Sequence, residues 1–183
     1  MTRIAILAGA WLVWFLGLTA LGKGHRQPAV RKDPKARWGL ALQMTGYCIV
    51  NVHTPDFWKS ELPMWRAIAA VAFALISIAI FRSAVASLGP QWRFDAALNS
   101  DHELVQNGAY RLVRHPIYAS MLGMFLMDVW LAGTLPGWPI AFILFVAGTE
   151  IRVRIEDALL RERFGERFIA WRRSVPAYVP FVR

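Results

Sequence analysis

The sequence predicts an all-α, polytopic membrane protein with five transmembrane helices and a cytoplasmic C-terminal amphipathic helix. Of its 183 residues, 56% are apolar and 18% are charged, whereas soluble domains carry about 25% charged residues. The apolar residues lie in long blocks that contain few charges, and the Lys and Arg residues lie between these blocks and after the last one. We therefore expect a single integral membrane domain over residues 1–183.

The first three apolar blocks predict spans at residues 4–22, 38–55 and 64–88. The first is uncharged and long enough to cross roughly 30 Å of hydrocarbon. Arg3 before it is also typical of a signal peptide. The apolar run is long for such a peptide, however, and six Lys or Arg residues follow within residues 23–37. We therefore expect the first span to be retained.

The last apolar block predicts a helical hairpin. Residues 117–149 contain a single charge, Asp128, and a straight helix of that length would reach about 50 Å. Two Gly and two Pro residues within residues 133–139 mark a turn. We therefore predict the fourth and fifth spans at residues 117–132 and 138–153.

The distribution of basic residues predicts the orientation. Six Lys or Arg lie in residues 23–37, four Arg in 82–114 and eight Arg in 152–183, whereas the opposite loops contain only Lys59 and Arg66. With five spans, all three basic segments face the cytoplasm and the N-terminus lies outside. The same distribution explains the net charge of +9 without a nucleic-acid partner, so we expect membrane lipids as partners and no nucleic acid.

The cytoplasmic segments, residues 89–116 and 150–183, contain the candidate ligand-binding residues. Apolar residues recur after the fifth span at spacings of four, four and three: Leu160, Phe164, Phe168 and Trp171. This pattern indicates an amphipathic helix that either lies on the membrane or covers a site between the spans. Gly165 is a candidate break in it.

Two polar clusters stand out within these segments. Pro116 favours the first helical position, which places His115 at the cap of span four. Free N–H groups there, with Arg114 beside them, suit an anion, although both residues are equally suited to anchoring a span among lipid headgroups. In the second cluster Arg152 and Glu156 share a helix face, while Arg154 and Asp157 lie on a neighbouring face. These four charges suit either a salt-bridged cap or a ligand with both signs of charge.

Two further features concern metals and the membrane interior. The four histidines lie far apart, so we expect no metal site. Asp128 lies within the predicted fourth span, where an ionisable residue is a functional candidate. Its position near the predicted turn is equally consistent with a place among the outer headgroups.

The C-terminal half resembles a known family. The run HELVQNGAYRLVRHPIYAS is followed, after the hairpin, by RVRIEDALLRERFGERFIAWRRSVPAYVPF. In order and spacing these motifs resemble the isoprenylcysteine carboxyl methyltransferase family, and the related phospholipid methyltransferases share the Arg-His-Pro motif. The resemblance covers roughly residues 86–182, including Leu88-Gly89-x-x-Trp92.

The resemblance implies S-adenosylmethionine as the methyl donor. It implies a donor-binding set consisting of His102, Glu103, Leu104, Val105, Tyr110, Arg114, His115, Pro116, Ile117, Tyr118, Glu156 and Asp157. It also implies that Arg152 faces the acceptor and that Arg152 and Glu156 form the catalytic pair. Asp157 is shorter than the second glutamate of the family's Glu-Glu pair, and Asp95 stands where some relatives have a glutamine; both departures bear on the substrate more than on the donor.

The activity implied by the resemblance is methyl transfer to a lipophilic acceptor, most directly the carboxylate of an isoprenylated cysteine or a similar thioether acid. N-methylation of a lipid amine and S-methylation of a small thiol are the alternatives within this class. An NADPH-dependent membrane reductase is a more distant alternative, because sterol reductases share a related C-terminal architecture. The sequence leaves the oligomeric state open.

Overall fold

The structure, a computed structural model, describes residues 2–21, 29–52, 57–58, 60–92, 97–99, 103–132 and 137–180. Its helices are α1 (Thr2–Leu21), α2 (Ala36–Asn51), α4 (Met64–Leu88), α5 (Pro116–Ala132), α6 (Trp138–Phe164) and α7 (Glu166–Ser174). Two short 3₁₀ turns, η1 (Gly89–Gln91) and η2 (Gly108–Arg111), lie between α4 and α5. The predicted all-α class is confirmed, with one small addition: strands β1 (Ala29–Lys32) and β2 (Ala97–Asn99) form an antiparallel pair.

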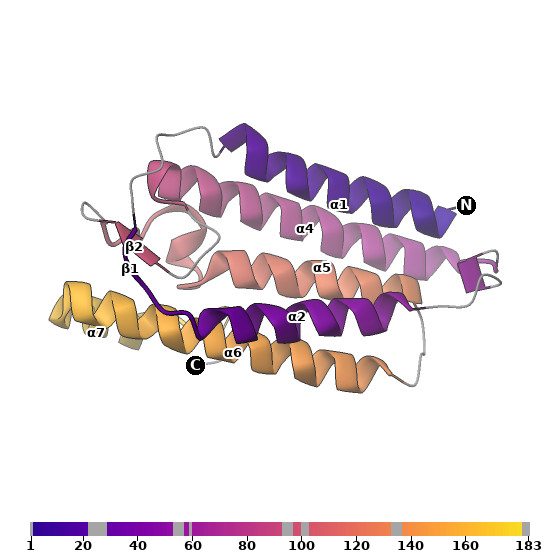
Figure 1. The fold of residues 1–183 in the computed structure, drawn as a ribbon. Helices are drawn as coiled ribbons and strands as arrows, with labels where there is room; N and C mark the ends of the chain where they lie inside the picture. Colours follow the sequence, from indigo (N-terminus) through magenta and orange to yellow (C-terminus); the bar gives the residue numbers. More distant parts are fainter. Residues whose placement is uncertain are drawn as a thin grey trace.

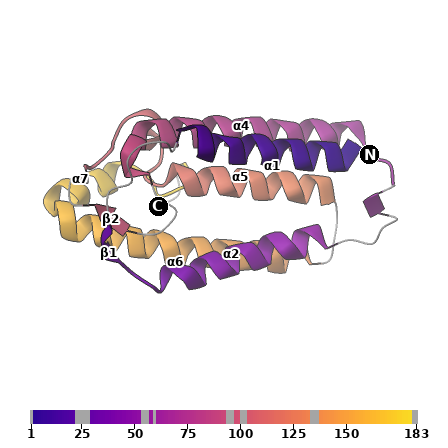
Figure 2. The same ribbon diagram turned by 45° about the horizontal axis from the view of Figure 1, so that its top comes forward.

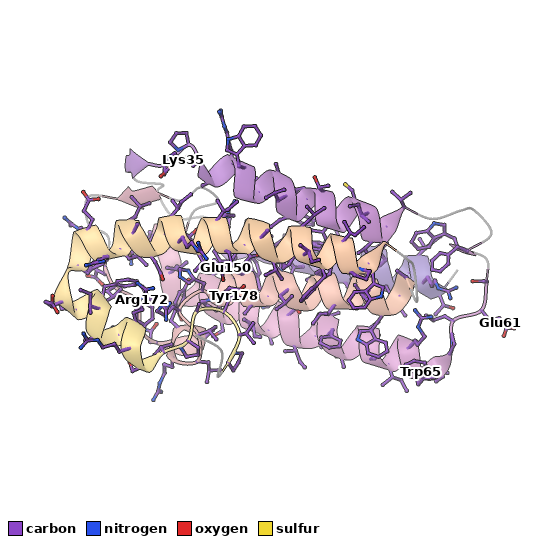
Figure 3. All side chains as sticks on the ribbon, turned by 90° about the horizontal axis from the view of Figure 1, so that it is seen from below. Lys35, Glu61, Trp65, Glu150, Arg172 and Tyr178 are labelled. Carbon is purple, nitrogen blue, oxygen red and sulfur yellow. The ribbon has the colours of Figure 1, made fainter. Side chains whose placement is uncertain are left out.

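The five long helices lie side by side and alternate in direction along the chain (Figure 1). Helix α2 packs along α6, α4 along α5, and α1 along α4. Figure 2 shows α5 between the α1–α4 pair and the α2–α6 pair. One end of the bundle contains the strand pair, η2, α7 and the start of α5 (Figure 1). Glu61 and Trp65 lie at the other end (Figure 3).

The described helix bounds match the predicted spans within a few residues, with one clear difference. Helix α6 continues eleven residues beyond the predicted end at residue 153 and stops at Phe164. The residues after 153 include no helix breaker before Gly165, which has a φ of +54°, a conformation that glycine adopts without steric cost. The predicted break at Gly165 is thus confirmed, and the part of α6 after residue 153 is a direct extension of the last apolar helix.

Glycine permits an unusually close approach between α2 and α6. A Cβ atom on Gly148 would lie 2.4 Å from the carbonyl oxygen of Gly39, closer than real atoms allow. Just beyond this crossing, Gln43 Nε2 donates a 2.9 Å hydrogen bond to Thr149 Oγ1. The crossing brings α2 beside the part of α6 that carries Arg152.

Among the described residues, one helical stretch, Met64–Gln91, is long and apolar enough by itself to cross a membrane. Thr2–Gly17 and Pro116–Ala132 are apolar but shorter. Large apolar side chains are nevertheless exposed along several helices: Leu12, Leu16, Ile68, Leu75, Ile76, Ile140 and Ile143. An apolar exterior of this extent suits contact with lipid.

Candidate functional site

A cavity of about 820 Å³ runs along the bundle from the end where α5 begins. We call its polar part the polar chamber; it is lined by Gln91, Glu103, Tyr110, Arg114, His115, Tyr118, Arg152, Glu156 and Trp171. We call the rest the apolar arm; it is lined mainly by Leu7, Trp11, Trp14, Phe15, Leu40, Met44, Tyr47, Cys48 and Met121, from α1, α2 and α5. A charged chamber is therefore continuous with an apolar channel.

The start of α5 is held by the C-terminal tail. The backbone N–H of Arg114 donates to the carbonyl of Pro176 at 2.8 Å, and that of His115 donates to the carbonyl of Ala177 at 2.7 Å. The expectation of free N–H groups for an anion is therefore wrong at His115, whose N–H is occupied by the tail. The tail turns away from α7 at Val175, where the backbone is extended, and its carbonyls then supply the capping that a helix start requires.

The His115 imidazole lies between two carboxylates on α6. Its Nε2 is 2.8 Å from Asp157 Oδ1, and its Nδ1 is 3.2 Å from Glu156 Oε2. Burial by itself lowers the pKa of His115, but the hydrogen bonds with Asp157 and Glu156 outweigh it, so the pKa lies above 6.5. Burial likewise raises the carboxyl pKa values of Glu156 and Asp157, and the pairing with His115 brings both below their ordinary values. The two carboxylates thus stabilise the protonated form of the imidazole relative to its neutral form.

Asp157 lies behind His115 and is not among the residues that line the cavity. Its Oδ2 accepts a 3.2 Å hydrogen bond from Arg114 Nη2 and lies 3.6 Å from Nε of Arg172 on α7. The expectation that Asp157 contacts the methyl donor therefore finds no support in this geometry. The shorter aspartate holds Arg114 and His115 in place, while the neighbouring Glu156 reaches the chamber.

Tyr118 connects the two candidate catalytic residues. Its hydroxyl donates to Glu156 Oε1, and Arg152 Nε donates to the same hydroxyl oxygen at 2.8 Å. The guanidinium carbon of Arg152 also lies 5.4 Å from the centre of the Tyr118 ring, a cation–π distance. Arg152 and Glu156 share a helix face, as predicted, and a tyrosine from α5 fixes their mutual orientation.

The segment before α5 forms another wall of the chamber. Gly108 has a φ of +56°, and a Cβ on it would lie 2.3 Å from Ser87 Oγ, so only glycine fits against α4 here. This turn places Tyr110 in the wall, where burial and then the Glu156 carboxylate raise the pKa of Tyr110 and keep its phenol protonated. Nearby, Gln91 Oε1 accepts a 2.6 Å hydrogen bond from the backbone N–H of Glu103.

Helix α7 covers the chamber. Phe168 and Trp171 pack against Tyr110 and Ala84, and Leu160 and Phe164 from the end of α6 join the same cluster. Of the two roles left open for the amphipathic segment, this packing supports covering the site. Trp171 itself reaches the cavity wall.

The structure brings most of the predicted donor-binding residues together. Those lining the cavity are Glu103, Leu104, Val105, Tyr110, Arg114, His115, Ile117, Tyr118 and Glu156, together with the predicted acceptor residue Arg152. Pro116 begins α5 but is absent from the lining. His102 and Asp95 lie outside the described residues. Arg154 is exposed and pairs with Glu150 at 3.4 Å, away from Asp157.

The sequence analysis did not identify the residues of α1 and α2 that line the cavity. Trp11, Trp14 and Phe15 lie at spacings of three and one along α1, and Tyr47 faces Trp11 with ring centres 5.1 Å apart. Aromatic residues on one face of an apolar helix were the available signal. Nothing local distinguishes such a face from one that contacts lipid.

Comparison with known proteins agrees with this assembly. The sequence profile of the isoprenylcysteine carboxyl methyltransferase family matches residues 70–162, which contain most of the cavity residues from α4, α5 and α6. Protein-S-isoprenylcysteine O-methyltransferase A of Arabidopsis thaliana is 28% identical over 126 residues, which are 64% of this chain and 61% of the relative.

Two further relatives carry the same enzyme name. Protein-S-isoprenylcysteine O-methyltransferase B of Arabidopsis thaliana is 32% identical over 87 residues, 44% of this chain and 41% of the relative. Protein-S-isoprenylcysteine O-methyltransferase of Schizosaccharomyces pombe is 34% identical over 90 residues, which are 46% of this chain and 36% of the relative. The chain thus spans less than two thirds of the length of each of these relatives. The profile match covers half of the chain, and the chain belongs to the isoprenylcysteine carboxyl methyltransferase family.

Proposed function

We propose that this protein transfers a methyl group from S-adenosylmethionine to the carboxylate of an isoprenylated cysteine. The observation that carries the proposal is the single cavity that joins the polar chamber to the apolar arm. An isoprenylated cysteine has the matching shape, with a charged carboxylate at one end and a long apolar chain at the other. The relatives that carry this enzyme name support the same acceptor.

The polar chamber fits the methyl donor. The donor carries an ammonium, a sulfonium and a carboxylate, and the chamber offers charges of both signs. The Glu156 side chain is 27% exposed, and its carboxylate suits a cationic group of the donor. The faces of Tyr110 and Trp171 in the wall suit the sulfonium and the adenine. When bound, S-adenosylmethionine supplies an electrophilic methyl group.

Arg152 is the residue that we assign to the acceptor carboxylate. A guanidinium binds the two oxygens of a carboxylate in one plane, and the hydrogen bond from Nε to Tyr118 limits its rotation. The acceptor carboxylate is already ionised at neutral pH, so the chain needs no general base. Its task is to align the two reactants and exclude water, and the packing of α7 over the chamber serves the second purpose.

The proposed setting is a membrane crossed by α1, α2, α4, α5 and the first part of α6. The N-terminus then lies outside, and the polar chamber opens near the cytoplasmic face beside the basic segments. The alternation of helix direction and the exposed apolar side chains support this arrangement. In this setting the apolar arm lies at the depth of the lipid chains, from which an isoprenoid enters.

Methyl transfer to defined acceptors tests the proposal. The purified protein in detergent is given radiolabelled S-adenosylmethionine and N-acetyl-S-farnesylcysteine, with its methyl ester and unprenylated N-acetylcysteine as matched controls. We expect base-labile label in the first acceptor and none in the controls. Donor binding without transfer to the farnesylated acid would refute the proposed acceptor.

A further inference from the structure

Helices α1 and α2 lie outside the segment that matches the family profile, residues 70–162, yet both contact the cavity. Trp11 on α1 and Asn51 on α2 donate hydrogen bonds to Asp128 on α5, at 3.3 Å and 3.0 Å. Asp128 is 1% exposed, so it is an internal hydrogen-bonded residue rather than one among the outer headgroups. A second contact of α2 lies near the start of that helix and concerns the acceptor residue Arg152.

Gly39, near the start of α2, lies against the aliphatic stem of Arg152. A Cβ atom on Gly39 would be 2.6 Å from Arg152 Cγ and 3.4 Å from Arg152 Cδ. The first distance is far below the optimal carbon–carbon separation of about 3.5–4.0 Å. Glycine is less favourable than alanine within a helix, so this position gives up helix stability and provides space. The stem of Arg152 occupies the space that a side chain at position 39 would fill.

The other end of the Arg152 side chain is held by α5. Its Nε donates to the Tyr118 hydroxyl at 2.8 Å, and its guanidinium carbon lies 5.4 Å from the centre of the Tyr118 ring. Arg152 is buried, so its side chain passes from α6 along the backbone of α2 to Tyr118. Its direction is therefore defined by two contacts, with Gly39 at the stem and with Tyr118 at the guanidinium.

We propose that Gly39 is a positioning residue that acts through Arg152 on the acceptor carboxylate. This inference rests on the proposed function, because it takes Arg152 as the residue that binds the acceptor. A methyl group on residue 39 would displace Cγ of Arg152. Since side chains occupy discrete staggered rotamers, the displaced stem would adopt another χ1 angle and carry the guanidinium away from Tyr118. The acceptor carboxylate would then no longer be aligned with the methyl donor.

The same methyl group would also meet the backbone of α6, at 2.7 Å from the carbonyl oxygen of Gly148, and this effect needs a control. Gly46 lies seven residues, or about two helical turns, further along α2. A Cβ atom on Gly46 would likewise be 2.7 Å from a carbonyl oxygen of α6, that of Ala141, and its next neighbours are atoms of Phe145. Gly46→Ala therefore imposes the same collision between the two helices at a distance from Arg152.

The experiment measures kcat/KM for N-acetyl-S-farnesylcysteine and the Kd of S-adenosylmethionine in the wild type, Gly39→Ala and Gly46→Ala. We expect Gly39→Ala to lower kcat/KM at least about tenfold, because a small misplacement of an aligning group is costly. Its donor Kd should stay near the wild-type value, since Glu156 keeps its contact with His115. Gly46→Ala should keep both values near those of the wild type.

The variant Arg152→Ala separates positioning from packing. It removes the stem, so Gly39→Ala added to it should lower the residual kcat/KM no further, whereas an independent packing defect would lower it again. If Gly39→Ala by itself does not fold, the double variant should recover folding and donor binding, because the methyl group then enters the space that the stem has left.

Four results would overturn the positioning role while leaving the proposed function intact. These are undiminished kcat/KM in Gly39→Ala, an equal loss in Gly46→Ala, a further loss in the double variant, and a double variant that stays unfolded. The last result would mean that the carbonyl of Gly148, and not Arg152, requires glycine at position 39. Donor binding by the wild type without transfer to the farnesylated acid would instead remove the proposed function, and this inference with it.

Discussion

Replacing Tyr118 with phenylalanine removes one oxygen atom from the centre of the site. That oxygen accepts from Arg152 Nε at 2.8 Å and its proton is donated to Glu156. A hydrogen bond to a charged group contributes about 1.5–3 kcal/mol. If this contribution serves to hold Arg152 in the orientation required by the transition state, its loss lowers kcat/KM roughly ten- to hundredfold. The aromatic ring, and with it the packing of α5 against α6, is retained.

Donor affinity should change little in Tyr118→Phe, because Glu156 keeps its 3.2 Å contact with His115. The measurement is kcat/KM for the farnesylated acceptor, together with titration of S-adenosylmethionine on the same preparation. Tyr178→Phe is a closely matched control. The Tyr178 hydroxyl also donates to a glutamate of α6, Glu150, at 3.1 Å, and Figure 3 shows Tyr178 and Glu150 near each other. Undiminished activity in Tyr118→Phe, or an equal loss in Tyr178→Phe, would refute the positioning role.

Three further predictions address the acceptor residue, the imidazolium and the topology. Arg152→Lys keeps the charge but loses the planar fork, so donor affinity should stay near the wild-type value while methyl transfer falls at least about tenfold; full activity would exclude Arg152 from acceptor binding. Because the pKa of His115 is raised above 6.5, its stabilising contribution is complete below that pH and is lost as the pH rises through the raised value. The thermal unfolding midpoint in detergent should therefore fall as the pH rises above 6.5, and His115→Gln should abolish this dependence; an equal slope in the variant would contradict it. In a Cys48→Ser background, an impermeant thiol reagent applied from outside should label Glu61→Cys and spare Arg163→Cys, and the reverse pattern would invert the proposed orientation.

The helices and their approximate ends could be predicted because their signals are local. Apolar blocks, the Gly and Pro residues of the hairpin turn, and the positive-φ Gly165 each act within one or two turns of the chain. The Arg152–Glu156 face followed from helical spacing alone. The family resemblance added Tyr110, His115 and Tyr118, which the structure brings into one cavity wall.

The contacts that shape the site lie outside the reach of such local signals. The carbonyl of Ala177 caps the start of α5 at His115, and Asp157 is held behind the same histidine. A hydrogen bond joins Trp11 to Asp128 across more than a hundred residues. Each of these contacts depends on how whole helices pack, and no periodicity within one helix specifies which distant face it meets. The sequence by itself therefore determined the helices, the charged face of α6 and the family, whereas packing between distant segments decided which polar groups have partners within the chain and which residues line the cavity.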